Sequence, residues 1–337
     1  MKCGILLGAS SLAMGLAGSA ALADPTSYPL EIENCGRTVT FEEAPQNAVA
    51  LGQNSAEIML LLGLENRMAA TAFWPNDVLP EVREAYDEVD LLTVEFPALE
   101  AILSAEPDFV AAMLITLLGP DSRVAKHEDF DALGIPSYLS PSACSTTRDN
   151  GDAYGSRDAL WSMDELYTEI EDLSRIFDVA DRGDALIEDF KAREADLRAR
   201  FDDRDDLTFL FWFSSPSPED DAYLGGGNGP SGYIADLLGG SNAIDTVADW
   251  PTLGWEGIMA ADPTVMVATQ VDRERWSLDE AENKIAFLES DPVVSQMGAV
   301  QAGRIVVMSG AAMNPSIRTL YGAEEVAEQL EALDLAQ

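Results

Sequence analysis

The side chains of this sequence best suited to contact a ligand are tryptophans and arginines placed where buried strands are expected to end. They are Trp74, Trp212, Trp276, Arg273, Arg275 and Arg318. An indole ring can stack on a flat or apolar ligand, and a guanidinium can bind a carboxylate or phosphate through two hydrogen bonds. Ligands of open α/β sheets bind beyond the carboxyl ends of the strands. We therefore expect these six side chains to line a common cleft.

Each of these residues also has a simpler role open to it. A tryptophan beside a strand can fill the core of its own lobe, and an arginine in so acidic a chain can pair with a neighbouring carboxylate. The sequence does not decide between the two roles for any one residue.

Catalytic and metal sites have little support in the sequence. The chain has one histidine, His127, and it lies in a charged run typical of an exposed helix. No GxSxG motif accompanies it, and a zinc site would need several such ligands. The GxGxxG string at 227–232 contains Pro230 and does not directly follow a strand, which favours a loop over a phosphate site. We predict no catalytic residue, no resident cofactor and no metal bound by the protein itself.

Two stretches of the chain occur twice. EAILSAEPDFV at 100–110 aligns with EGIMAADPTVM at 256–266, and SAEIMLLLGLEN at 55–66 aligns with SGYIADLLGGSN at 231–242. These spacings far exceed the unit of a solenoid, which is about 20–50 residues. The repeats predict two similar lobes around a ligand cleft, each with an acid, Glu100 or Glu256, at the start of the matching helix.

Hydrophobic periodicity predicts the elements that position these residues. Helical patterns alternate with short apolar runs, which indicates an α/β fold with parallel-rich sheets flanked by helices. The predicted strands are 48–51, 68–72, 108–113, 137–139, 207–213, 264–269 and 304–308. The predicted parts are an N-terminal lobe over 24–160, a helical connector over 161–205 with a break near 178–183, and a C-terminal lobe over 206–337.

Residues 1–23 have the pattern of a secretory signal peptide. Lys2 supplies a positive end, an apolar stretch follows, and Ala21 and Ala23 mark a small-residue cleavage site. Ser19 stands where lipid attachment would require a cysteine. We expect a soluble periplasmic protein.

Two cysteines, Cys35 and Cys144, remain after the removal of this segment. Two cysteines in an exported protein usually pair, and the alternative is two free thiols. Neither belongs to a CxxC motif, so we expect a structural disulfide rather than redox catalysis.

The formal net charge is −40, from 60 acidic and 20 basic side chains. Nucleic-acid binding is excluded, because phosphate contacts need a basic footprint. The acids are spread along the whole chain, which is typical of a strongly solvated surface and is tolerable where salt screens repulsion. An anionic ligand would have to be held by a local basic cluster against this field.

The chain resembles the periplasmic substrate-binding proteins of ferric-siderophore, haem and vitamin B12 ABC importers. The resemblance runs across nearly all of 28–333 and rests on the order of several motifs together with the duplication. The motifs are YPLEIENCGRTVTF at 28–41, LLGL at 61–64, the first copy of the longer repeat, LESDPVV at 288–294 and AGRIV at 302–306.

This resemblance implies two lobes joined by one long helix, a shallow cleft and little hinge motion. It also implies that Glu100 and Glu256 pair with arginines of a membrane permease dimer; the alternative is that both acids only stabilise their helix N-termini. The first expected ligand is an iron–siderophore complex, and haem, a corrinoid or a deazaflavin precursor are the alternatives. The protein is expected to act as a monomer.

Two other classes of protein compete with this interpretation. An exported α/β enzyme would need a nucleophile, a base or a metal cluster, and the sequence offers none. A structural or adhesion protein would need neither a cleft nor the duplicated acids.

Overall fold

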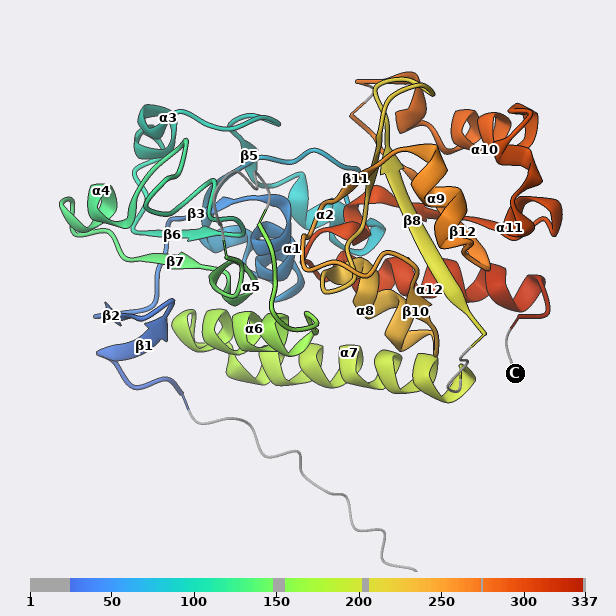
Figure 1. Cartoon of the computed structure of the whole chain (residues 1–337). Coiled ribbons are helices and arrows are strands. Elements are labelled where there is room, and N and C mark those ends of the chain that lie inside the picture. Colours follow the sequence, from blue (N-terminus) through green and yellow to red (C-terminus); the bar gives the residue numbers. More distant parts are fainter. Residues whose placement is uncertain (1–24, 148–154, 202–205, 274, 336–337) are drawn as a thin grey trace, which may run out of the picture.

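The computed structural model describes residues 25–147, 155–201, 206–273 and 275–335, which form two lobes side by side (Figure 1). The expected signal peptide, residues 1–23, lies outside the described residues. Among those described, no helix combines the length and the apolar character that a membrane crossing requires.

The N-terminal lobe contains a five-stranded parallel sheet in the order β5-β4-β3-β6-β7. β3, β6 and β7 are buried along their whole length, as is usual for parallel strands covered by helices. The strands are β3 (Ala48–Leu51), β4 (Met68–Ala72), β5 (Asp90–Leu91), β6 (Phe109–Ala112) and β7 (Ser137–Leu139). The helices are α1 (Gln53–Leu61), η1 (Glu65–Arg67), η2 (Pro80–Val82), α2 (Arg83–Tyr86), α3 (Leu99–Ser104), α4 (His127–Asp131) and α5 (Pro141–Cys144).

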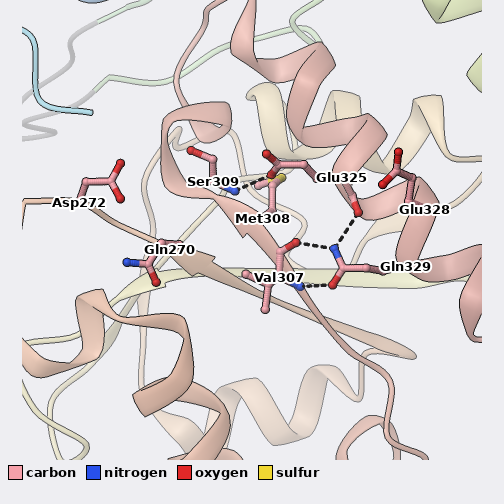
Figure 2. A pocket seen from close by; sticks show the side chains of 8 residues that line it. All are labelled: Gln270, Asp272, Val307, Met308, Ser309, Glu325, Glu328 and Gln329. Atoms are coloured by element: carbon pink, nitrogen blue, oxygen red, sulfur yellow. Dashed lines mark hydrogen bonds between the residues drawn. The ribbon is translucent and has the colours of Figure 1, made fainter. Parts of the chain in front are cut away.

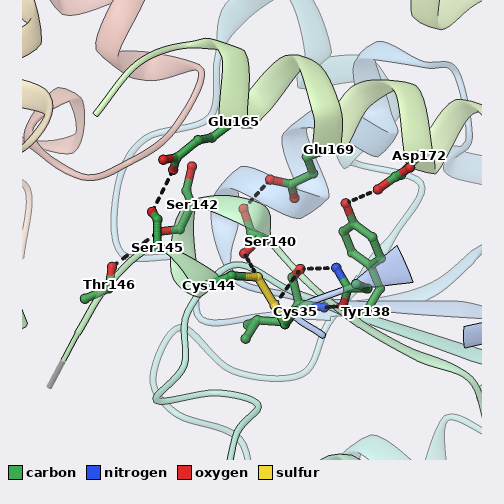
Figure 3. Close-up of a disulfide and its surroundings, with 12 residues drawn as sticks. Cys35, Tyr138, Ser140, Ser142, Cys144, Ser145, Thr146, Glu165, Glu169 and Asp172 are labelled. Carbon is green, nitrogen blue, oxygen red and sulfur yellow. Dashed lines mark hydrogen bonds between the residues drawn. A yellow bond between two sulfur atoms is a disulfide. The ribbon is translucent and has the colours of Figure 1, made fainter. Parts of the chain in front are cut away.

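An antiparallel hairpin precedes this sheet and is joined to the lobe by a disulfide (Figure 3). Its strands are β1 (Leu30–Asn34) and β2 (Arg37–Phe41). Cys35, in the turn, is bonded to Cys144 at the end of α5, so the predicted pairing is confirmed. Beside it, Asn34 exchanges two hydrogen bonds with the backbone of Leu139.

The C-terminal lobe contains a sheet in the order β11-β9-β8-β12-β13, with β10 also paired to β8. β8, β12 and β13 are parallel, whereas β9 is antiparallel to both of its neighbours. The strands are β8 (Thr208–Ser214), β9 (Ala222–Leu224), β10 (Ser241–Asn242), β11 (Thr252–Leu253), β12 (Val265–Gln270) and β13 (Ile305–Ser309). The helices are α8 (Pro230–Leu237), α9 (Trp255–Ala261), η3 (Ser277–Asp279), α10 (Ala281–Ser290), η4 (Val294–Gln296), α11 (Gly298–Gln301), η5 (Gly310–Met313) and α12 (Arg318–Ala332).

The sequence repeat corresponds to a repeat in structure. α3 leads from β5 into β6, and α9 leads from β11 into β12, which holds the same place in its sheet. The aligned acids Glu106 and Asp262 follow these helices with φ of 51° and 43°, in the left-handed conformation that ends a helix. Gly63 and Gly239 do the same after α1 and α8, with φ of 67° and 74°. The predicted two-lobed α/β fold is confirmed.

The connector consists of two helices, α6 (Asp164–Ile176) and α7 (Ala180–Arg200), of which α7 runs along the base of both lobes (Figure 1). Asp178, with φ of 56°, separates them. Gly183 lies inside α7 rather than at the break. A glycine is needed at this position because a Cβ there would lie 2.3 Å from Ser174 Oγ on α6. α7 bonds to the N-terminal lobe through Arg182, which donates to Leu62 O, and to the C-terminal lobe through Arg193.

One hydrophobic core continues across the boundary between the lobes. It contains Ile58 and Phe109 of the N-terminal lobe together with Phe209, Tyr233 and Ile317 of the C-terminal lobe. A smaller core lies on the outer face of each sheet. Shared burial of this kind opposes separation of the lobes, because opening would expose apolar surface to water.

Candidate functional site

The carboxyl ends of the two sheets meet at the lobe boundary. Asp77 follows β4 of the N-terminal lobe and Asp272 follows β12 of the C-terminal lobe, and the Asp77 amide lies 3.4 Å from Asp272 Oδ2. Asn54, at the start of α1, accepts a hydrogen bond of 2.9 Å from the backbone amide of Ile317. Loops that follow strands in both lobes therefore border one region, which is where a doubly wound fold places its ligand.

A buried ion pair crosses this boundary from the C-terminal lobe. Arg318 Nε lies 3.1 and 3.0 Å from the two carboxylate oxygens of Glu57, and its Nη2 also donates to Glu57 and to the carbonyl of Asp77. Burial raises the pKa of Glu57, and the guanidinium opposes that rise. These bonds direct Nε and Nη2 of Arg318 toward the N-terminal lobe, and its contact with a ligand stays a prediction.

A second arginine crosses the boundary in the opposite direction. Arg157 is 3% exposed, and its Nε lies 3.2 Å from Asp249 of the C-terminal lobe. Its remaining donors reach Ser142 O, Ser145 Oγ and Thr146 Oγ1 around α5. The two lobes thus hold each other by reciprocal arginine contacts.

Four half-buried aromatic side chains of the C-terminal lobe, Phe213, Tyr223, Trp250 and Trp276, form a continuous group that we name the aromatic wall. Phe213 and Trp250 meet edge to face with ring centroids 4.9 Å apart, and Tyr223 stacks on Trp276 at 5.7 Å. The Arg273 guanidinium joins the two pairs, 5.2 Å from the centroid of Phe213 and 4.6 Å from that of Trp276. The wall therefore offers π faces and one cation to a ligand.

Asp279 holds the loop that carries Arg273 and Trp276. Its carboxylate is fully buried and accepts hydrogen bonds from Arg273 at 3.1 and 3.2 Å and from the amides of Arg275 and Trp276 at 2.8 and 2.9 Å. Ser214 Oγ, 2.6 Å away, donates a further bond. Burial opposes ionisation, but the bonds from Arg273 and Ser214 outweigh it and keep the pKa of Asp279 below its usual value.

Lys284 supports the same loop from inside the lobe. Its fully buried ammonium group donates to the carbonyls of Thr269 at 2.6 Å and Asp279 at 3.1 Å. Burial lowers the pKa of Lys284 to about 7. The sequence gives no signal of this role, because Lys284 lies in a mixed polar and apolar stretch, AENKIAFLES at 281–290, and the carbonyl of Thr269 belongs to a separate strand.

The structure brings three of the predicted ligand residues together. Arg273 and Arg275 both lie over Trp276, with the Arg275 guanidinium 4.9 Å from the ring centroid. Arg275 and Arg273 are exposed and Trp276 is half-buried, so all three are accessible. Their contact with a ligand stays a prediction.

Trp212 does not belong to this group. It is fully buried on the outer face of the sheet, edge to face with Trp255 at 4.9 Å, and its Nε1 donates to Ser215 Oγ. Successive residues of a strand point to opposite faces, so the side chain at the wall is the next one, Phe213. The prediction for Trp212 is wrong, and the alternation along β8 was the signal for Phe213.

Trp74 is also a core residue. It is 4% exposed and packs on Tyr86 with centroids 4.5 Å apart, so the prediction that it lines a cleft is wrong. Its neighbour Phe73, with φ of 60°, is half-buried and lies 4.7 Å from Phe96.

The predicted exposed histidine is buried instead. His127 is 8% exposed, and its Nδ1 lies 2.8 Å from Ser137 Oγ on β7. Burial lowers the pKa of His127 to about 4, so the ring is neutral near pH 7. Over the described ranges, no three or more His, Cys, Asp or Glu side chains are arranged to hold a metal ion.

A pocket of about 450 Å³ lies between the carboxyl ends of β12 and β13 and helix α12 (Figure 2). Gln329 closes one side through hydrogen bonds to the amide and carbonyl of Val307, and Glu325 accepts from the amide of Ser309. Asp272 and Glu328 add acidic side chains to its lining. The pocket is therefore polar and negatively charged.

Glu100 and Glu256 occupy equivalent positions on the two lobes. Each is exposed and lies in the first turn of its helix, α3 or α9. Both helices begin after a strand that runs in the direction of the central strands, so each acid lies at the carboxyl edge of its sheet. Their role in docking stays a prediction.

Comparison with known proteins gives consistent similarities. The model of a family described as periplasmic binding protein matches residues 49–312. A vitamin B12-binding protein of Vibrio parahaemolyticus is 21% identical over 296 residues, or 86% of this chain and 91% of that protein. A periplasmic binding protein from Veillonella parvula superposes with a TM-score of 0.72 at 21% identity, covering 90% of this chain and 97% of that one. A protein of an ABC-type Fe³⁺-hydroxamate transport system from Saccharomonospora viridis superposes with a TM-score of 0.69, also at 21% identity, covering 90% of this chain and 99% of that one.

Proposed function

The chain belongs to the periplasmic binding protein family, and from that premise we propose that it captures a small solute outside the cytoplasm and delivers it to an ABC importer. The proposed solute is an iron–siderophore complex; haem, a corrinoid and a deazaflavin precursor are the alternatives within the same family. The relatives are binding proteins, and we propose no catalytic step.

The observation that carries this proposal is the aromatic wall with Arg273 between Phe213 and Trp276. Such a surface suits a ligand with broad apolar or unsaturated faces, because ring faces contribute both apolar contact area and attraction for positive charge. Metal chelates and tetrapyrroles have this shape. The bound solute would lie on the wall at the lobe boundary, where loops of both lobes are within reach.

The lobe boundary supports capture without large closure. The continuous core, the Arg318–Glu57 pair and the Arg157–Asp249 pair each cross it. Opening would break all three, so we propose that the lobes move little when the solute binds. Delivery would then depend on docking, and we propose that Glu100 and Glu256 contact a two-fold symmetric basic partner.

Titration of intrinsic tryptophan fluorescence against ferric siderophores, haem and cobalamin tests the proposal. One of these compounds is expected to bind, and Trp276→Ala is expected to weaken its binding about tenfold or more, because stacking area is lost. Trp255→Phe serves as the control, since this indole lies outside the wall in the same lobe. Failure of every compound to bind, or equal weakening by both variants, would contradict the proposed site.

A further inference from the structure

The loops that carry the aromatic wall are acidic. Residues 215–221, which follow β8, contain Glu219, Asp220 and Asp221 and no basic residue. Residues 272–280, which follow β12, contain four acids and two arginines. Both loops leave the carboxyl ends of central strands, so their negative charge lies beside the wall rather than on a remote surface.

The arginines in this region are largely neutralised by the protein itself. Arg273 makes two hydrogen bonds to the fully buried carboxylate of Asp279. Arg318 is paired with Glu57, and Arg157 with Asp249, in both cases within the lobe boundary. Arg275 is exposed and adds one charge, but Asp272 and Glu280 lie on the same loop.

The N-terminal lobe does not offset this charge. The loop at 73–79, after β4, contains one ionisable residue, Asp77. The stretch at 113–126, after β6, contains Asp121, Arg123 and Lys126. Together these two segments are neutral, so the site remains within the field of a chain whose net charge is −40.

We propose that the solute on the aromatic wall carries no net negative charge: it is a neutral or cationic metal chelate with apolar or unsaturated faces. This inference rests on the proposed function and narrows its ligand class. Aromatic rings give apolar contact to an unsaturated ligand face, and a neutral chelate loses little on leaving water. A trianionic chelate would approach against the field of the whole chain and would meet guanidiniums already bound to carboxylates.

The test compares three ferric tris-chelates, which share a metal and a coordination geometry but differ in charge, with two tetrapyrrole-type compounds. A cationic and a neutral ferric tris-hydroxamate, a trianionic ferric tris-catecholate, neutral cyanocobalamin and haem with its two propionates are titrated at low and high salt. The neutral and cationic compounds are expected to include the tightest binder, and the tris-catecholate is expected to bind at least about tenfold more weakly than it. The difference in affinity between the tris-catecholate and the tightest binder is expected to decrease at high salt, because salt screens charge repulsion but not stacking.

Asp272→Asn removes one exposed acid and keeps an acceptor for the Asp77 amide. It is expected to strengthen binding of the tris-catecholate about threefold or more while changing the binding of the neutral tris-hydroxamate less than about twofold. Glu289→Gln, which removes an exposed acid from α10, is expected to change neither.

Two results would overturn the inference and leave the proposed function intact. One is a tris-catecholate or haem that binds more tightly than every neutral or cationic compound at low salt. The other is an Asp272→Asn variant whose binding of the anionic compounds is unchanged. Failure of all five compounds to bind would instead contradict the proposed function itself.

Discussion

Arg318, at the start of α12, and Glu57, on α1, form a buried ion pair that joins the C-terminal lobe to the N-terminal lobe. The same arginine donates to the carbonyl of Asp77, which holds the loop after β4 against the other lobe. Burial of a carboxylate is costly unless a partner compensates it, so each residue of the pair depends on the other.

Arg318→Met is expected to lower the free energy of unfolding by about 3–5 kcal/mol, because it leaves Glu57 buried without its counter-charge. Reversible urea denaturation measures the change. The control is Arg198→Met, which breaks the half-exposed pair with Asp236 and is expected to cost less than about 1 kcal/mol. The double variant Arg318→Met with Glu57→Gln is expected to recover part of the loss. Equal effects of the two arginine variants would contradict a boundary role for Arg318.

Glu169, on α6, makes folding stability dependent on pH. Its carboxylate is fully buried and accepts a bond of 2.5 Å from Ser140 (Figure 3). It also accepts bonds from Ser55 and Asn54, at 2.8 and 3.2 Å. Burial raises the pKa of Glu169 to about 7. The folded state therefore binds this proton more strongly than the unfolded state. The resulting stabilisation is fully present below the unfolded pKa of about 4.5 and is lost as the pH rises from there through the folded pKa of about 7.

Glu169→Gln removes this proton linkage and keeps the shape of the side chain. Its amide oxygen can accept from Ser140 and Asn54, and its amide nitrogen can donate to the Ser55 hydroxyl. The stability of the variant relative to the parent is expected to grow by roughly 2–4 kcal/mol between pH 4.5 and pH 7.5. Urea denaturation at several pH values checks this. A difference that stays constant with pH would show that Glu169 is already ionised in the folded protein.

The disulfide between Cys35 and Cys144 closes a loop with a sequence separation of 109. Replacement of both cysteines with serine is expected to lower the free energy of unfolding by up to about 4–5 kcal/mol, because the unfolded chain gains freedom. Reduction of the parent protein with dithiothreitol should give the same loss. Titration of the denatured, unreduced protein should find no free thiol at these two positions, and two reactive thiols per chain would contradict the pairing.

The sequence was informative where one local pattern determines the outcome. Apolar runs placed β3, β4 and β7 with their observed bounds, and the duplicated motif located both helix ends that carry Glu106 and Asp262. The two cysteines that follow the expected signal peptide, Cys35 and Cys144, allow one intramolecular pair. In each case the information lies within a short segment or in a count.

The sequence was misleading where the placement of a side chain depends on the direction in which it points from a strand or on a partner far away in the chain. Trp212 and Phe213 are adjacent and equally apolar, and the pleat of β8 sends the first to the outer core and the second to the wall. Arg318 meets Glu57 only because α12 begins beside α1. Four short strands of two or three residues, β5, β9, β10 and β11, were not predicted, and neither was the hairpin of β1 and β2.

Glu100 and Glu256 provide the last prediction. Both are exposed at the starts of equivalent helices, α3 and α9, one on each lobe. An exposed acid in the first turn stabilises its helix only slightly, by roughly 0.3–1 kcal/mol, so the two residues are largely free to meet a basic partner. We therefore expect the double variant Glu100→Ala, Glu256→Ala to keep its solute affinity and nearly its melting temperature while uptake through the importer is lost.

Uptake of the compound identified by titration, measured in cells or in vesicles with the reconstituted importer, checks this expectation. The matched control is Glu106→Ala with Asp262→Asn, which changes the acids at the ends of the same two helices and should leave uptake intact once any loss of stability is accounted for. At a desolvated contact, paired charges govern the rate and orientation of docking far more than they do on an open surface. If the Glu100, Glu256 variant instead weakened solute binding and retained uptake per bound molecule, both acids would belong to the binding site, and the docking role would be wrong.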